Sequence, residues 1–437
     1  MYEKLIYLFS ISSILYFAYV LIKFGDPKMY LLSVLYLLPF MNFYATKVSM
    51  GGFKVFDVVT FGALLYLLKY FLVDNYINKK YFHLLLFLLL LAIAVIGSLI
   101  SEHPNKSLVD VFKIIPIFVF CRFLMLECLQ DSSFHYKIIN VLKLAFSVAI
   151  VFLLIQLIFG LKFTFYHTLN INTLDPFSGK IRYPGYFHDS QVQGQFFSVG
   201  SFLFLYVKQE AKVSFRLLNY FMFFMAVVAI YMCGSRSAFL GFGIGLVLSM
   251  LTIGKKYIGY LFIGVLLLGA TVFYFQDKIT ILNRSKDIGS DLKFRQTIWK
   301  EAYKIGTEHP FFGIGSGNYE EYTKLHNPNQ YFELENNEIA YFDQPENGYL
   351  KILVEFGFTG LAIFLLMVIT PLVASFLDYV RGIRSNGIIL FISAAISFLV
   401  AFNSVYSLFD TRMLIVFSAI IVLLITYPKN QIYGEEN

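Results

Sequence analysis

The sequence contains little charge, one tryptophan and three cysteines. Only 14% of its 437 residues are charged, whereas soluble domains carry about 25%. Cys121, Cys128 and Cys233 all lie inside apolar runs, where they are expected to pack as small hydrophobic residues. These shortages exclude an ordinary soluble chain, a disulfide-linked secreted scaffold and a cysteine-based metal site.

Apolar and aromatic residues replace the missing charge. The chain is 58% hydrophobic, its 50 Phe and 31 Tyr are spread along its whole length, and its mean hydropathy is +0.68. Backbone in lipid must bond to itself, so apolar runs of about 20 residues indicate transmembrane helices. Their lack of alternation excludes a β-barrel. The sequence therefore predicts an all-α, polytopic transmembrane bundle of about 12 to 13 spans, with one long, partly helical extracytoplasmic loop.

Two polar stretches divide the expected spans into groups. The spans are predicted near 4–22, 29–46, 55–73, 81–100, 108–128, 138–160, 191–207, 215–233, 237–253, 257–275, 348–377, 386–405 and 411–427. Pro39 and Asn42 make the second the weakest. The predicted units are N-terminal helices (1–160), central helices with an extracytoplasmic loop at 161–190 (161–275), a large extracytoplasmic loop (276–347, the long loop) and C-terminal helices (348–437). The first span lacks a cleavage site and is expected to be retained.

The net charge of +7 is best explained by connections between spans. Basic residues gather in alternate connections, which predicts that these are cytoplasmic. They are Lys79, Lys80, Lys208, Lys212, Arg216, Lys255, Lys256, Arg381 and Arg384. The remaining connections, 163–190, 234–236 and 276–345, should share one extracytoplasmic compartment, and counting back from a cytoplasmic C-terminus puts the N-terminus outside. Nucleic acid is not an expected partner, because the basic residues never cluster on a polar stretch.

Three arginines fall on the predicted extracytoplasmic side. Arg236 lies among the small residues of Gly234-Ser-Arg-Ser237, which leave room for a phosphate to bind its guanidinium bidentately. Arg182 precedes a span that opens with several glutamines, and Arg295 lies in the long loop. The alternative for Arg236 is an interfacial arginine that contacts lipid headgroups, and for Arg295 a solvated basic face.

The long loop is predicted to contain a helix and a tight turn. Apolar residues spaced by three and four over 291–307 indicate an amphipathic helix on the membrane face. Pro310 and the glycines of 313–317 should end it in a turn. That turn lacks the Lys-Ser/Thr of a phosphate-binding loop, so nucleotide binding is not predicted. The histidines lack the spacing of metal ligands, and no metal site is predicted.

Glu346 is the candidate base, because it lies where the long loop returns to the bilayer. A half-buried carboxylate has a raised pKa and can act as a general base. The alternative is a helix start, where Glu346 complements the macrodipole and Asn347 caps the first turn. Glu355, inside the following span, must face the bundle interior. Asp110 and Lys113 are expected to form a structural pair.

The late half resembles the O-antigen ligase and polymerase family of membrane glycosyltransferases. The similar segments are Arg182-x-x-Gly-x-Phe187, Gly234-Ser-Arg-Ser237 with Leu240-Gly241, Arg295 with Trp299, Pro310-Phe-Phe-Gly-Ile-Gly315, Asn347-Gly-Tyr-Leu350 and Glu355-Phe-Gly-Phe-Thr-Gly360. The resemblance implies a bacterial inner-membrane protein with an extracytoplasmic active face. It also implies a polyprenyl-diphosphate-linked oligosaccharide as substrate, a chain-length regulator and a flippase as partners, and a diphosphate held by Arg182, Arg236 and Arg295.

One departure from the family pattern bears on the reaction. Ligases of this family have a pattern similar to His-Asn-x-x-Leu at the position where this chain has Glu346-Asn-Gly-Tyr-Leu350. The histidine of that pattern is therefore replaced by glutamate in this chain. Glutamate can still deprotonate a sugar hydroxyl, so the sequence favours polymerisation of O-antigen, capsule or exopolysaccharide repeat units. A ligase that acts on another acceptor, such as lipid A core, is the first alternative. A flippase is the second, but it should distribute polar residues through paired halves.

The implied reaction is physically coherent without a metal or another cofactor. Preorganised arginines in a partly desolvated site would neutralise the charge that develops on the leaving diphosphate. Glu346 would take the proton of the acceptor hydroxyl. Asn347, Tyr349 and Trp299 are expected to contact the saccharide, and the alternative for the aromatic residues is packing onto the bundle.

Overall fold

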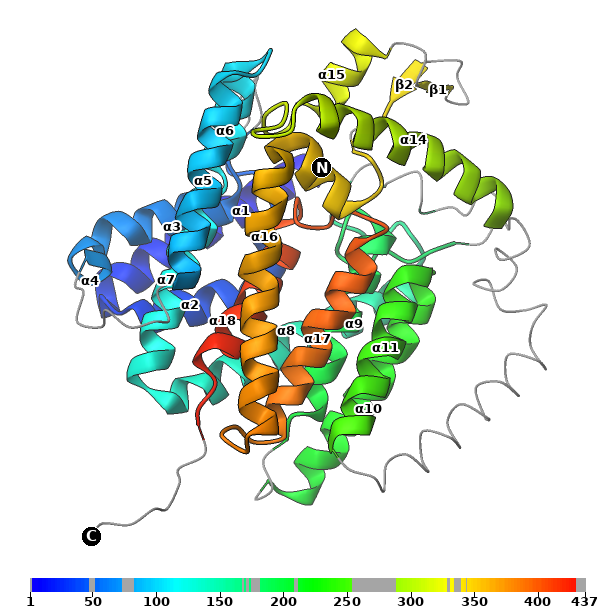
Figure 1. Cartoon of the computed structure of the whole chain (residues 1–437). Helices are drawn as coiled ribbons and strands as arrows, with labels where there is room; N and C mark the ends of the chain where they lie inside the picture. Colours follow the sequence, from blue (N-terminus) through cyan, green and yellow to red (C-terminus); the bar gives the residue numbers. More distant parts are fainter. Residues whose placement is uncertain are drawn as a thin grey trace.

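The computed structural model describes residues 2–46, 52–72, 82–166, 169, 173, 181–207, 211–253, 288–327, 331–333, 339–342 and 344–429. Helices dominate this part of the chain (Figure 1). The first half contains α1 (Tyr2–Phe24), α2 (Pro27–Tyr36), the short 3₁₀ helix η1 (Leu38–Phe40), α3 (Val55–Tyr66), α4 (Leu68–Leu72), α5 (Phe82–Leu99), α6 (Pro104–Phe112), α7 (Ile115–Gln130) and α8 (Ser132–Phe159).

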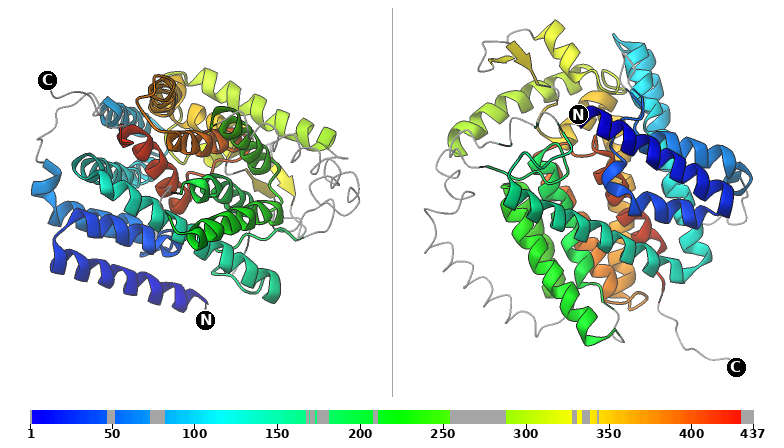
Figure 2. Two further views of the ribbon diagram at one scale, coloured as in Figure 1. Left: turned by 90° about the horizontal axis from the view of Figure 1, so that it is seen from below. Right: turned by 180° about the vertical axis from the view of Figure 1, so that it is seen from behind.

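The second half continues the bundle and adds a layer across one end of it. Its elements are α9 (Ser190–Leu205), α10 (Val213–Met232), α11 (Arg236–Ile253), α14 (Ile288–Glu308), α15 (Tyr319–His326), β1 (Tyr331–Glu333), β2 (Ile339–Tyr341), α16 (Gly348–Val380), α17 (Gly387–Phe402) and α18 (Thr411–Thr426). Seen from behind, α1 and α2 in blue lie on one side of the bundle and α10 and α11 in green on the other (Figure 2).

The chain is an all-α polytopic membrane protein, as predicted. Within the described residues, α1 from Ile6, α5, α8, α10 and α16 are long and apolar enough to cross a membrane. Shorter apolar helices are α3, α11, α17 and α18. The predicted span at 257–275 lies outside the described residues.

Three predicted spans are each broken into two helices, so the prediction of one continuous helix in each was wrong. The span at 29–46 divides into α2 and η1, with Pro39 inside η1. The span at 55–73 divides into α3 and α4. The span at 108–128 divides into α6 and α7, because Pro116 lies in the first turn of α7 and proline is tolerated at a helix start but not in its interior.

Glycines let α17 pack closely against α11 at the centre of the bundle. A Cβ at Gly241 would lie 2.3 Å from the carbonyl oxygen of Ser397, and one at Gly245 would lie 2.7 Å from that of Ser393. Small residues permit this close approach of backbones in lipid. The C-terminal end of α17 is thereby held among helices that carry the candidate site.

The amphipathic helix predicted in the long loop is α14, which lies across one end of the bundle (Figure 1). Its apolar residues Ile298, Ala302 and Ile305 are buried, as the spacing predicts. The strands β1 and β2 form a small antiparallel hairpin that pairs Tyr331 with Tyr341. The sequence did not predict this hairpin, because three-residue strands carry too little alternation to be recognised.

Helix α16 is interrupted at Gly357, whose φ of 70° is not helical. The glycine turn that follows α14 occupies the break. The backbone N–H groups of Ile314 and Gly315 donate to the carbonyl oxygens of Val354 and Glu355, at 2.9 and 3.2 Å. The predicted tight turn therefore exists, and it supplies hydrogen bonds that a continuous helix would make internally.

Candidate functional site

Arg182 and the Gly234-Ser-Arg-Ser237 turn lie together. The Arg182 side chain is buried, and a Cβ at Gly234 would lie 3.1 Å from both its Cγ and its Cδ. The N–H of Tyr183 also donates to the carbonyl oxygen of Met232, at 3.2 Å. Gly234 has a φ of 63°, a region that L side chains rarely adopt. The structure thus explains the glycine: it turns the chain and leaves space for an arginine.

Arg236 is the first residue of α11 and is partly exposed. A helix N-terminus carries free N–H groups and a partial positive charge, which favour a bound anion. Ser235 lies against α9, since a Cβ at Gly194 would be 2.8 Å from the Ser235 Cβ. The turn therefore places the start of α11, with Arg236 as its first residue, next to the glycine that contacts Arg182.

The glutamines that open α9 are buried in the bundle. Gln193 is fully buried, and neither atom of its amide has a hydrogen-bond partner within the described residues. The Gln195 amide nitrogen donates to the carbonyl oxygen of Ala401, at 2.8 Å. This contact links α9 to the end of α17.

Arg295 and Glu346 form the second pair. The Arg295 Nη2 lies 3.8 Å from the Glu346 Oε2, and each side chain is about one fifth exposed. The Arg295 Nη1 also donates to the carbonyl oxygen of Ser404, at 3.3 Å. Glu346 has a φ of 50°, which is uncommon for a residue other than glycine and marks a backbone held by its surroundings. The candidate base Glu346 is thus fixed at the end of the long loop, beside Arg295, the arginine predicted to bind a diphosphate.

Asn347 and Tyr349 are engaged in structural contacts. The Asn347 Oδ1 accepts from the N–H groups of Tyr349 and Leu350, so Asn347 caps α16 as the alternative interpretation predicts. Its Nδ2 donates to the Oδ1 of Asn403, at 3.0 Å. The Tyr349 hydroxyl donates to the carbonyl oxygen of Leu399, at 2.8 Å. These contacts anchor the start of α16 to the end of α17.

Trp299 lies one turn beyond Arg295 on α14, so the two share a face of the helix. Its indole Nε1 is buried and has no hydrogen-bond partner within the described part of the chain. An indole N–H is a donor only. Within the described residues this donor is therefore unsatisfied.

The end of α17 connects the two halves of the candidate site. Ala401 accepts from α9, Asn403 contacts the cap of α16, and Ser404 accepts from Arg295. Through Gly194, α9 in turn contacts the turn that carries Arg236. All four predicted charged residues are thus linked through one set of packed elements at the same end of the bundle.

Arg412 is a buried residue that the sequence did not single out. Its Nε donates to the Oδ1 of Asp410, at 2.9 Å, and its Nη1 donates to the carbonyl oxygen of Tyr186, at 2.6 Å. The guanidinium lies 4.1 Å from the ring centroid of Phe187. Arg412 therefore holds the segment that follows Arg182. The nearby Asp410 could have indicated from the sequence that Arg412 is paired. The contact with Tyr186 could not be predicted, because it joins residues that are 226 positions apart.

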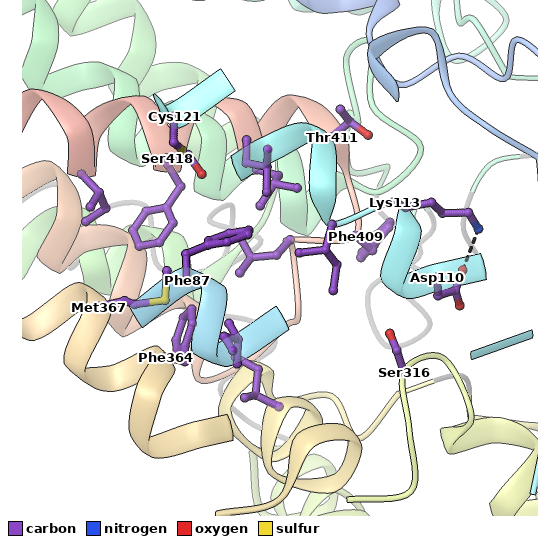
Figure 3. Close-up of a pocket in the computed structure, with 18 of the residues that line it drawn as sticks. Phe87, Asp110, Lys113, Cys121, Ser316, Phe364, Met367, Phe409, Thr411 and Ser418 are labelled. Carbon is purple, nitrogen blue, oxygen red and sulfur yellow. Dashed lines mark hydrogen bonds and ion pairs between the residues drawn. The ribbon is translucent and has the colours of Figure 1, made fainter. Parts of the chain in front are cut away.

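A cavity of about 460 Å³ lies beside this site, between α5, α7, α16 and α18. Asp110, Lys113 and Ser316 lie at one end of it, and Cys121, Ser418 and Met367 at the other (Figure 3). Its lining extends along α18 from Thr411 to Ile425, which corresponds to about 21 Å of helix. Most of its surface is apolar, and its length suits an extended hydrocarbon chain.

The polar end of the cavity is balanced in charge. Lys113 pairs with Asp110 at 2.6 Å, as predicted, and Lys351 pairs with Glu355 at 3.0 Å. Glu355 is buried and also accepts from the N–H of Gly317. These pairs therefore offer little attraction to an anion.

Residues 221–365 match the family model described as O-antigen ligase. The match includes Arg236, Arg295 and Glu346, whereas Arg182 lies outside it. No curated protein matches the chain. The predicted resemblance to the O-antigen ligase and polymerase family is confirmed over this stretch, and with it a role in polysaccharide assembly at a membrane.

Proposed function

We propose that the chain is a membrane glycosyltransferase that polymerises lipid-linked O-antigen, capsule or exopolysaccharide repeat units. The observation that carries this proposal is the pair formed by Arg295 and Glu346, 3.8 Å apart at the end of the long loop. It puts a potential base next to a cation that can bind a diphosphate. The active face is extracytoplasmic, on the side of α14.

In the proposed reaction, the arginines hold a polyprenyl diphosphate that carries the saccharide. The Glu346 carboxylate takes the proton of the acceptor hydroxyl, whose oxygen bonds to the anomeric carbon. The bond from that carbon to the diphosphate breaks, and the diphosphate leaves with the electron pair. Arg182, Arg236 and Arg295 stabilise the charge that develops on it, and Glu346 then returns its proton to water.

The cavity of about 460 Å³ supports the proposal that the substrate is linked to a lipid. Its polar end is formed partly by Lys351 and Glu355, on the first turns of the helix that begins next to Glu346. Tyr406 also lines it, two residues after the Ser404 that accepts from Arg295. A polyprenyl chain in this cavity would bring its diphosphate toward the arginines.

A ligase is the second candidate, because the matching family model is described as O-antigen ligase. Purified protein incubated with a lipid-linked repeat unit separates the two. A polymerase produces a ladder of products on the lipid carrier. A ligase leaves the repeat unit unextended until a separate glycan acceptor is added, and then transfers to that acceptor.

Glu346→Gln tests the proposed base. This variant keeps the size of the side chain, and loss of a general base should lower single-turnover elongation about 10²- to 10⁴-fold. Glu346→His should retain more activity than Glu346→Gln, because imidazole restores a base. Glu308→Gln is the matched control, since Glu308 is an exposed glutamate on α14. Near-parental turnover in Glu346→Gln, with unchanged thermal melting, would show that the base lies elsewhere.

A further inference from the structure

A second cavity, of about 250 Å³, is lined in part by the start of α10, a helix end that lies opposite α14 and α15 (Figure 1). It is enclosed by α8, the end of α9 and the start of α10. Its lining includes Tyr136, Asn140, Lys143, Tyr206, Val207 and Phe215. Nothing in the proposed reaction uses this cavity.

Lys143 is a buried cation whose contacts with the described residues around this cavity are all with neutral groups. Its side chain is 6% exposed. The ammonium donates to the carbonyl oxygen of Tyr206, at 2.6 Å, and to the Oδ1 of Asn219, at 2.8 Å, and lies 5.8 Å from the ring of Phe215. Among the described residues, no carboxylate pairs with it. A buried charge without a counter-charge is costly, so the cavity favours an anionic ligand.

The helices around the cavity present apolar side chains to lipid. On α8, Leu144 and Val148 are exposed, and on α10, Val213 and Leu217 are exposed. An anion that enters here is therefore next to a surface suited to acyl chains. The same end of the bundle carries basic residues, including Arg381 and Arg384, which predict that this end lies at the cytoplasmic face. Anionic lipids concentrate in that leaflet.

We propose that this cavity binds the phosphate group of an anionic phospholipid from the cytoplasmic leaflet, with Lys143 as its counter-charge. The acyl chains lie along the exposed apolar faces of α8 and α10. The Tyr136 hydroxyl and the Asn140 amide, which also line the cavity, supply further donors. The proposal does not depend on the glycosyltransferase function.

The test uses the full chain in nanodiscs of phosphatidylcholine with or without phosphatidylglycerol. Wild-type protein should melt at a higher temperature with phosphatidylglycerol and should retain it over phosphatidylcholine in native mass spectrometry. Lys143→Met should lose the thermal gain and reduce selective retention about fivefold or more, the effect of removing one basic contact with an anionic surface. Lys143→Arg should keep both, because it retains the charge.

Lys137→Met is the matched control, because Lys137 is exposed on the same helix and the variant loses the same charge. Equal effects of the two Met variants would overturn the proposal in favour of general surface attraction. Glu210, whose structure lies outside the described residues, is close in sequence to the cavity residue Val207. If Glu210→Gln abolishes the dependence on Lys143, that carboxylate is the counter-charge and the proposal fails.

A free anion is the remaining alternative. If millimolar inorganic phosphate raises the melting temperature in phosphatidylcholine as much as phosphatidylglycerol does, the cavity takes phosphate and not a lipid. If Lys143→Met does not fold, selective retention in wild-type protein decides the question. Equal retention of the two lipids by wild-type protein overturns the proposal.

Discussion

Arg236 shows how a short sequence pattern can specify the surroundings of one side chain. The glycine before it turns the chain with a φ of 63° and leaves space for Arg182. The turn thus places Arg236 two residues after the glycine that contacts the Arg182 side chain. A guanidinium offers a planar set of donors that an ammonium lacks.

Arg236→Lys should therefore lose activity although it keeps the charge. An ammonium cannot make the bidentate contact with a phosphate. The loss should approach that of Arg236→Ala in single-turnover elongation at matched protein level. Arg381→Lys, on the opposite end of the bundle, is the control and should behave as the parent. Parental activity of Arg236→Lys would favour the alternative in which this arginine only contacts lipid headgroups.

Residue chemistry could be predicted from sequence where it is local. The Arg236 turn and the Asp110 pair depend on neighbours within a few positions. The Arg295 contact with Glu346 and the Arg412 contact with Tyr186 join distant parts of the chain. Position in the long loop and family resemblance pointed to Arg295 and Glu346 individually, but the sequence predicted neither of the two contacts.

At the scale of elements, an ion pair and a hydrogen bond hold α15 against α6 and the residues just before it. The Lys106 ammonium lies 2.8 Å from the Glu321 carboxylate of α15, and His326 lies 2.7 Å from Glu102. The hydrogen bond from Lys106 lowers the pKa of Glu321. The contribution of this ion pair to stability is therefore fully present above the ordinary carboxyl pKa of 4.5. It is lost as the pH falls through the lowered pKa of Glu321.

A charge swap should test this contact. Lys106→Glu should increase deuterium uptake in 319–326 because two carboxylates then face each other, and Lys106→Glu with Glu321→Lys should restore protection. Both side chains are about one third exposed, so the effect should be modest, roughly 1 kcal/mol or less, and smaller at high salt. Unchanged uptake in the single variant would show that apolar packing alone holds α15.

The periodicity of α14 was sufficient to predict that helix, whereas the break between α6 and α7 and the interruption inside α16 were not predicted. A window of apolar residues looks continuous whether or not a neighbouring segment supplies hydrogen bonds inside it. Only tertiary contacts, here between the glycine turn and Val354 and Glu355, determine that α16 is interrupted.

At the scale of the whole molecule, the orientation in the membrane follows from the charge of the connections. The end that carries α14 and α15 is predicted to be extracytoplasmic, and the end with Arg381 and Arg384 cytoplasmic. The arginine site and the Lys143 cavity then lie at opposite faces of the membrane. Their proposed ligands would come from different leaflets.

Cysteine labelling in intact cells should confirm this orientation. In a background without Cys121, Cys128 and Cys233, Ser178→Cys and Ser285→Cys should react with a membrane-impermeant thiol reagent. Ser178 and Ser285 lie outside the described residues. Ser385→Cys should react only after the membrane is permeabilised. The opposite pattern would place the proposed active face in the cytoplasm.

The interruption of α16 changes the cost of inserting this helix into a bilayer. Residues 358–380 alone extend about 34 Å, more than the roughly 30 Å of a hydrocarbon core. The preceding turns, which carry Lys351 and Glu355, are then not needed to cross the membrane. An inserting segment that begins after Gly357 avoids transferring this ion pair into lipid, and the charged turns can remain with the long loop from the start of biogenesis.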